Sequence, residues 1–186
     1  MSGHSHAKTI KHQKNLTDQK RGQIFSKMAR VISIAAKEGG PNPETNTKLK
    51  VAIEQAKGFN LPKENIERAI RQATGGGGEE ANLEEVIFEA YGPGGIAVII
   101  EGITDNKNRT LGEIKQILSQ HGAKLVGEGG VRWMFERKTT ETGSPEWVPK
   151  QGEIEVASQD KEACEKLFEA LDENDAVQEI YSNLKL

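Results

Sequence analysis

The residues with the clearest chemical use are cations gathered in the first 37 positions of the chain. Lysine and arginine side chains bind phosphate oxygens, and histidine, serine and glycine backbone groups can add to such contacts. Eight lysines and arginines stand here against a single acid, Asp18, so the local field attracts polyanions. The residues that we expect to contact nucleic-acid phosphates are Gly3, His4, Ser5, Lys8, Lys11, His12, Lys14, Lys20, Arg21, Lys27 and Arg30.

Charge is segregated between the two parts of the sequence. Residues 1–74 hold 14 Lys and Arg against 6 Asp and Glu, a formal charge of +8. Residues 75–186 hold 11 against 22, a formal charge of −11, and the two parts sum to the −3 of the whole chain. The first part therefore suits phosphate, whereas the second part would repel it.

Plainer interpretations of these cations also exist. A short basic run is typical of a solvated tail, but the basic face of the next expected helix continues the run and favours a nucleic-acid surface. Arg68 and Arg71 each follow an acid by four residues, Glu64 and Glu67, and such pairs usually lie on a solvated helix face. We therefore give these two arginines less weight.

The sequence holds no zinc-finger, cold-shock or RNA-recognition signature that would read base edges. Recognition of the shape and backbone of a structured RNA therefore fits better than reading of a specific promoter. Binding to duplex DNA stays open as the alternative, and it would require a specific site preferred by well over ~10³.

Other motifs favour structure over chemistry. The glycine-rich residues 92–95 precede a strand and lack a following Gly-Lys-Ser/Thr, so they predict a hairpin turn and not a phosphate loop. The Ser2-Gly3-His4 start could form a square-planar copper or nickel site, but no acid or cysteine ligand lies nearby. Cys164 falls on an apolar helix face, where a buried structural thiol is the default. We expect no catalytic residue, metal or cofactor.

The sequence also argues against several other classes of protein. Neither paired carboxylates in an apolar setting nor a nucleophile with a base supports an enzyme or a small-molecule sensor, and we expect no small-molecule substrate. A single cysteine fits a reducing compartment. No apolar run approaches the ~18–20 residues of a membrane span. We expect a cytoplasmic protein without a membrane partner.

Helices must position the cations of the first part. Residues 17–37 place Ile24, Phe25, Met28, Val31, Ile32 and Ala35 on one face, with Lys20, Lys27, Arg30 and Lys37 opposite. Gly39-Gly40-Pro41 stops this helix, and two further helices are expected at about 47–58 and from Pro62 onward. The glycines at 75–78 read as a linker. We therefore expect a basic helical domain over 1–76 and an acidic domain over 77–186.

Strands appear after the linker. Residues 86–91 and 96–103 predict a hairpin whose second strand is central, and Thr110 opens a helix through a capping box with Glu113. A half-buried strand is expected at 131–136, a loop at 138–151, a strand near 154–156, a helix from Ser158 and a last strand at 177–181. The fold class is α+β, a three-helix domain followed by a ferredoxin-like sandwich with an extra edge strand at 86–91.

Several motifs resemble those of the YebC/PmpR-like family, which includes mitochondrial translational activators. The matching segments are Gly3-His4-Ser5, Ile10-Lys11-His12, Lys20-Arg21-Gly22, Ile24-Phe25-Ser26-Lys27, Pro62-Lys63-Glu64-Asn65-Ile66-Glu67-Arg68-Ala69-Ile70, Tyr91-Gly92-Pro93-Gly94-Gly95 and Thr104-Asp105-Asn106-Lys107-Asn108-Arg109-Thr110. The resemblance implies either a DNA-binding transcriptional regulator or a ribosome-associated translation factor. The second type helps elongation past difficult peptides such as proline runs and binds ribosomal RNA of the large subunit.

The chain departs from the family pattern in two places. His6-Ala7 stands where family members usually have Lys-Trp, so an expected stacking aromatic is missing. Family members also usually insert an additional α/β domain after the strand equivalent to 131–137, where this chain has only the loop 138–151. Loss of that insertion should leave the ferredoxin-like unit closed.

Overall fold

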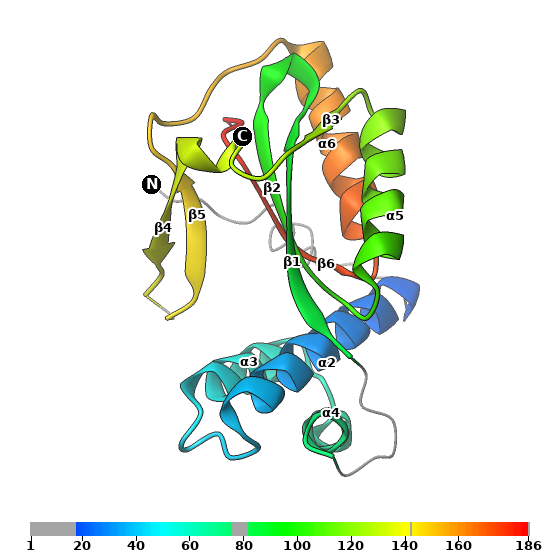
Figure 1. Cartoon of the computed structure of the whole chain (residues 1–186), viewed down its shortest axis with the longest axis vertical. Coiled ribbons are helices and arrows are strands. Elements are labelled where there is room, and N and C mark those ends of the chain that lie inside the picture. The colour runs from blue at the N-terminus through cyan, green and yellow to red at the C-terminus, as the bar shows by residue number, and fades with distance from the viewer. Residues whose placement is uncertain (1–17, 76–81, 142, 186) are drawn as a thin grey trace. The chain divides into compact units, whose positions relative to one another are not determined.

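The computed structural model describes residues 18–75, 82–141 and 143–185 (Figure 1). They form two compact units, which we call the helical unit and the sheet unit. The helical unit holds the described residues up to Glu84 together with Ile103–Asn106, and the sheet unit holds Glu85–Gly102 and the described residues from Lys107 onward. The predicted linker lies mostly outside the described residues, so a domain boundary at residue 76 stays a prediction.

Three helices build the helical unit, as predicted: α2 (Asp18–Gly39), α3 (Thr47–Gly58) and α4 (Lys63–Ala73). Their apolar stripes share one core, in which Ile32, Leu49 and Ala56 have no exposed surface. The predicted stripe of α2 is confirmed, because Ile24, Met28, Ile32 and Ala35 all lie in this core. Helix propensity contributes little compared with burial of these faces, so the stripes determine the fold.

Asn46 joins the end of α2 to the start of α3. Its Oδ1 accepts from the Leu49 N–H at 3.0 Å, which caps α3, while its Nδ2 donates to the carbonyl oxygens of Ala35 at 2.7 Å and Gly40 at 2.9 Å. One buried amide therefore satisfies backbone groups at two helix ends. Glycine at position 39 provides the space for the Asn46 side chain, since a Cβ there would lie 2.6 Å from Asn46 Nδ2.

A four-stranded sheet forms the centre of the sheet unit, in the order β3-β1-β2-β6. Its strands are β1 (Glu84–Tyr91), β2 (Ala97–Thr104), β3 (Lys124–Val126) and β6 (Val177–Ser182). The predicted central position of β2 is confirmed, and β3 and β6 are the edges. The prediction that the first strand is an extra edge strand is wrong, because β1 lies between β3 and β2.

Different elements cover the two faces of the sheet (Figure 1). Helices α5 (Lys107–Gln120) and α6 (Ser158–Asp172) pack on one face, where Ile100, Leu118 and Leu167 lie in the larger core. On the other face, Ile99 and Tyr181 pack with Phe135 from a two-stranded sheet of β4 (Phe135–Thr139) and β5 (Pro145–Pro149). The predicted class, N-terminal helices followed by an α+β sheet, is confirmed.

Three local predictions in the sheet unit need correction. The strand expected at 131–136 begins only at Phe135, because Arg132–Met134 form a 3-10 turn. The loop expected at 138–151 contains β5, which pairs antiparallel with β4. The strand expected near 154–156 is reduced to one bridge between Ile154 and Leu184.

The glycine-rich residues 92–95 form the predicted hairpin turn. Pro93–Gly95 make a 3-10 turn between β1 and β2, and the Gly92 N–H donates to the Ile96 carbonyl oxygen at 2.8 Å. Gly94 and Gly95 have φ angles of 68° and 76°, a backbone region that favours glycine. Their positions therefore follow from the turn and need no ligand.

Helix α5 begins at Lys107, earlier than the capping box at Thr110 predicts.

Candidate nucleic-acid interface

Seven of the predicted contact residues lie outside the described residues. They stay predictions, and they are Gly3, His4, Ser5, Lys8, Lys11, His12 and Lys14.

Two predicted contacts lie at the start of α2. The side chains of Lys20 and Arg21 are exposed. Arg21 has one acidic neighbour, Asp18, at 3.8 Å, and both side chains are largely solvated. An exposed pair at this distance contributes little and opens readily. The charge of Arg21 therefore remains accessible to a phosphate.

Lys27 does not lie on an exposed basic face, so that prediction is wrong. The residue is 2% exposed. The reason is that α2 is buried on more than its main stripe: Ile34, which lies seven residues after Lys27 on the same side of the helix, is buried too and lies outside the core that the main stripe forms. Arg30 is half-buried, and its Nη1 donates to the Ile103 carbonyl oxygen at 3.1 Å. It is already engaged within the helical unit.

Arg68 and Arg71 of α4 were expected to pair with the preceding acids, and they do not. Glu67 instead lies 3.6 Å from Lys63, in the opposite direction along the helix. Both arginines are exposed and make no ion pair with any described residue. Three residues apart on one helix, they present two guanidinium groups on the same side of α4.

Further exposed cations of the helical unit were not singled out from the sequence. Lys48 is paired with Glu38 at 2.7 Å, but three other lysines have no ion pair within the described ranges. Lys50 and Lys57 are seven residues apart, a spacing that puts both on one side of α3 and could have indicated them. We call the exposed cations of the helical unit that have no ion pair with a described residue the accessible cations: Lys37, Lys50, Lys57, Arg68 and Arg71.

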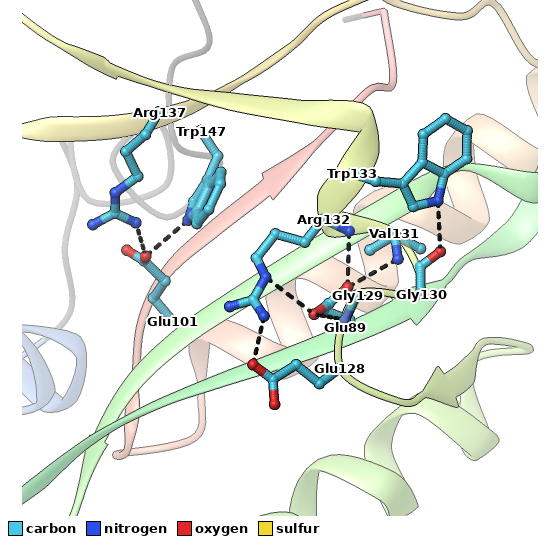
Figure 2. Close-up of polar contacts among 10 residues, drawn as sticks. All are labelled: Glu89, Glu101, Glu128, Gly129, Gly130, Val131, Arg132, Trp133, Arg137 and Trp147. Carbon is cyan, nitrogen blue, oxygen red and sulfur yellow. Dashed lines mark hydrogen bonds and ion pairs between the residues drawn. The ribbon is translucent and has the colours of Figure 1, made fainter.

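The sheet unit contains a different kind of polar centre, built on Glu89 of β1 (Figure 2). The Glu89 carboxylate is 3% exposed and accepts three backbone N–H groups, from Gly129 at 2.7 Å, Val131 at 2.9 Å and Arg132 at 2.8 Å. The Arg132 guanidinium lies 3.5 Å away. Burial alone raises the pKa of Glu89, but the three hydrogen bonds and the charge of Arg132 outweigh it, so the pKa is lowered.

The loop held by Glu89 presents an aromatic side chain. The Trp133 indole N–H donates to the Gly130 carbonyl oxygen at 3.1 Å, and Figure 2 shows the ring on the outside of this loop. Arg132 reaches back to Glu128, with 2.7 Å between Nη2 and the carboxylate. One buried acid therefore shapes a whole surface loop.

A second carboxylate fastens the β4–β5 hairpin to the sheet (Figure 2). Glu101 of β2 accepts from the Arg137 guanidinium and from the Trp147 indole N–H, the latter at 2.9 Å. The Arg137 guanidinium also lies over the Trp147 ring, 4.8 Å from its centroid. These contacts give Glu101 a structural role, because they attach the hairpin to the sheet.

Cys164 has the predicted structural role. The thiol is fully buried, and it donates to the Pro93 carbonyl oxygen at 3.5 Å. Burial first, then the nearby Asp160 and Glu165, raise the pKa of Cys164 to about 11. Such a thiol is a poor nucleophile at neutral pH. Over the described ranges, no three His, Cys, Asp or Glu side chains are grouped to hold a metal ion, and no helix is long and apolar enough to cross a membrane.

Known proteins match both units. Residues 5–76 match the TACO1/YebC protein N-terminal domain, and residues 83–142 match the TACO1/YebC second and third domain. A relative from Caldanaerobacter subterraneus, named "Probable transcriptional regulatory protein", is 41% identical over 241 residues, covering 100% of this chain and 99% of the relative. Another of that name from Dictyoglomus turgidum is 43% identical over 190 residues, covering 100% and 76%.

A solved structure agrees with the fold. A conserved hypothetical protein from Aquifex aeolicus superposes with a TM-score of 0.84 at 33% identity, over 95% of each chain. The 241 positions aligned with the Caldanaerobacter relative exceed the 186 residues of this chain, so that relative carries positions that are absent here. Two domain matches in order, together with relatives this similar over the full chain, establish that the protein is a member of the TACO1/YebC family.

Proposed function

We propose that this protein is a cytoplasmic, non-enzymatic factor that binds ribosomal RNA of the large subunit and relieves stalled translation, for example at proline runs. The observation that carries the proposal is the set of accessible cations on α2, α3 and α4, which adds to Lys20 and Arg21. The accessible cations make no ion pair with a described residue, so they can bind phosphate without first breaking such a pair.

The other side chains of the described helices favour a structured RNA as the target. The described helices carry no exposed aromatic side chain for stacking and no motif that reads base edges. Such a surface recognises the shape and the phosphates of its target. Folded ribosomal RNA presents closely spaced phosphates in fixed positions, so it suits this surface.

Co-sedimentation with large ribosomal subunits tests the proposal. Reversing Arg68→Glu and Arg71→Glu should weaken binding at low salt, and the slope of log affinity against log salt should become shallower by about 1.5. The matched control is Lys115→Glu with Lys150→Glu, which changes the net charge equally at two exposed sheet-unit lysines. Equal binding by the two double variants would contradict the proposal.

A DNA-binding transcriptional regulator is the second candidate, favoured by the names of the relatives. It requires a duplex site that the protein prefers over random duplex by more than ~10³. A footprinting screen that finds a protected site with such a preference would favour this candidate. Ribosome profiling of a deletion strain separates the two, since only the first predicts ribosomes accumulated at particular peptide motifs.

A further inference from the structure

The most exposed large hydrophobic residue among those described belongs to the sheet unit, whereas the accessible cations belong to the helical unit. Trp133 is 58% exposed. Its N–H is already bonded to the Gly130 carbonyl oxygen, and the Tyr91 hydroxyl donates to the same oxygen at a longer 3.4 Å. Two aromatic side chains therefore meet at one backbone atom. What Trp133 offers to a partner is the face of its ring.

The loop that presents Trp133 is held in one conformation before any partner binds. A buried carboxylate is costly unless it is fully hydrogen-bonded, and Glu89 meets that condition only through Gly129, Val131 and Arg132 of this loop. The three bonds hold the backbone on both sides of Gly130 and directly before Trp133. A side chain fixed in this way loses little conformational entropy on binding. This arrangement is more consistent with a binding surface than with chance exposure of the Trp133 side chain.

The residue types favour a protein partner over a nucleic acid. Trp, Tyr and Arg dominate binding energies at protein interfaces, and Trp133, Tyr91 and Arg132 occur together here. Arg132 is already paired with Glu128 and Glu89, so it does not offer an unmatched charge to phosphate. Residues 75–186, the part of the sequence to which Trp133 belongs, carry a formal −11, and such a charge repels nucleic acid and attracts cationic proteins. The face of an indole ring also binds Arg and Lys side chains.

We infer that Trp133, flanked by Tyr91 and Arg132, is the centre of a surface that binds a basic protein. The inference rests on the proposed function, under which the partner is a basic protein of the large ribosomal subunit. The sheet unit then contacts ribosomal protein, and the helical unit contacts ribosomal RNA. Because one chain makes both contacts, forming one of them raises the effective concentration for the other, and the overall affinity exceeds that of either contact alone.

Binding to two probes, intact large subunits and the same RNA stripped of protein, tests this surface. Trp133→Ala should weaken binding to intact subunits by about tenfold or more and leave binding to stripped RNA unchanged. Trp133→Phe, which keeps a ring, should retain most of the affinity. Leu111→Ala is the matched control, because it removes another exposed apolar side chain of the same unit.

The outcomes are distinguishable. Unchanged unfolding midpoints would show that the variants fold, as expected for a side chain this exposed. An equal loss on both probes would overturn the inference in favour of a stacked nucleobase, and unchanged binding on both would overturn it outright. Failure of the unaltered chain to bind either probe would instead overturn the proposed function, and the partner named here with it.

Discussion

Replacing Glu89 should destabilise the sheet unit more than any other single change to a polar side chain near the Trp133 loop. The Glu89 carboxylate is 3% exposed and receives three backbone N–H groups. Glu89→Ala removes the acceptor for all three, and the Val131 N–H, itself buried, is left without a partner. Each hydrogen bond to a charged group contributes about 1.5–3 kcal/mol, and an unsatisfied buried donor costs about 1–3 kcal/mol.

The contributions do not add fully, because water reaches the part-buried Gly129 and Arg132 N–H groups once the loop relaxes. We expect a loss of about 3–5 kcal/mol for Glu89→Ala, the range seen when one partner of a buried charged pair is removed. Glu89→Gln keeps one oxygen acceptor but turns an NH₂ group toward a donor, so a loss of about 2 kcal/mol is expected. Glu128→Gln is the control, since Arg132 is the one described residue with which that exposed side chain forms an ion pair.

Urea unfolding followed by tryptophan fluorescence measures these losses. Both tryptophans, Trp133 and Trp147, belong to the sheet unit, so the signal reports on that unit. Each kcal/mol should lower the thermal midpoint by about 4–8 °C for a unit of this size. A loss below about 0.5 kcal/mol for Glu89→Ala would refute the reasoning, because it would mean that the loop does not depend on the carboxylate.

The pH dependence gives a second check on Glu89. Its pKa is lower in the folded state than in the unfolded chain, so the folded state binds the proton less well. The stability that this difference contributes is complete above the ordinary pKa of glutamate and is lost as the pH falls through the lowered folded-state pKa. The difference in the free energy of unfolding between the unaltered chain and Glu89→Gln should therefore shrink on acidification below about pH 4.

Three further predictions follow from single contacts. Asn46→Ala should cost the helical unit about 2–3 kcal/mol in urea unfolding followed by circular dichroism, because it removes the cap of α3 and two bonds to the end of α2. Gly102→Ala should destabilise the sheet unit by about 1–3 kcal/mol, since a Cβ there would lie 2.7 Å from the Ala176 carbonyl oxygen; a stable variant would show that the β2–β6 register can shift. Cys164, whose pKa is about 11, should react with a thiol reagent at neutral pH only on unfolding, and rapid labelling of the native protein would contradict its burial.

Apolar periodicity predicted the elements well where burial determines them. The stripes of α2, α3 and α4 and the continuous apolar run of β2 are each long enough to fix the type of element and the face it buries. The partners of a strand are harder to predict. β1 is central because the short strand Lys124–Val126 covers its far edge, and three residues of mixed polarity give almost no signal in a sequence.

The candidate site was less predictable than the fold for a related reason. A helical wheel places a side chain around one axis, but burial depends on every element that packs against the helix. Lys27 is buried because α2 has a second buried face, and that face cannot be seen from the main stripe alone. Spacing of four residues likewise permits the pairs of Arg68 and Arg71 without requiring them, and Glu67 lies near Lys63 instead. Exposed ion pairs are weak, so sequence spacing cannot decide which of them form.

The β4–β5 hairpin is the place where we predict that this chain lacks positions that a relative carries. The match to the TACO1/YebC second and third domain ends at residue 142, within the connection between the two strands. The strands pair in register up to Thr139 and Pro145, so the two ends of any segment inserted there would emerge side by side. The Arg137 and Trp147 contacts to Glu101 hold the hairpin to the sheet below that point. A domain joined through adjacent ends can be gained or lost at little cost to its host. The sheet unit therefore closes on its own core, and its Trp133 loop depends on Glu89 and not on an inserted domain.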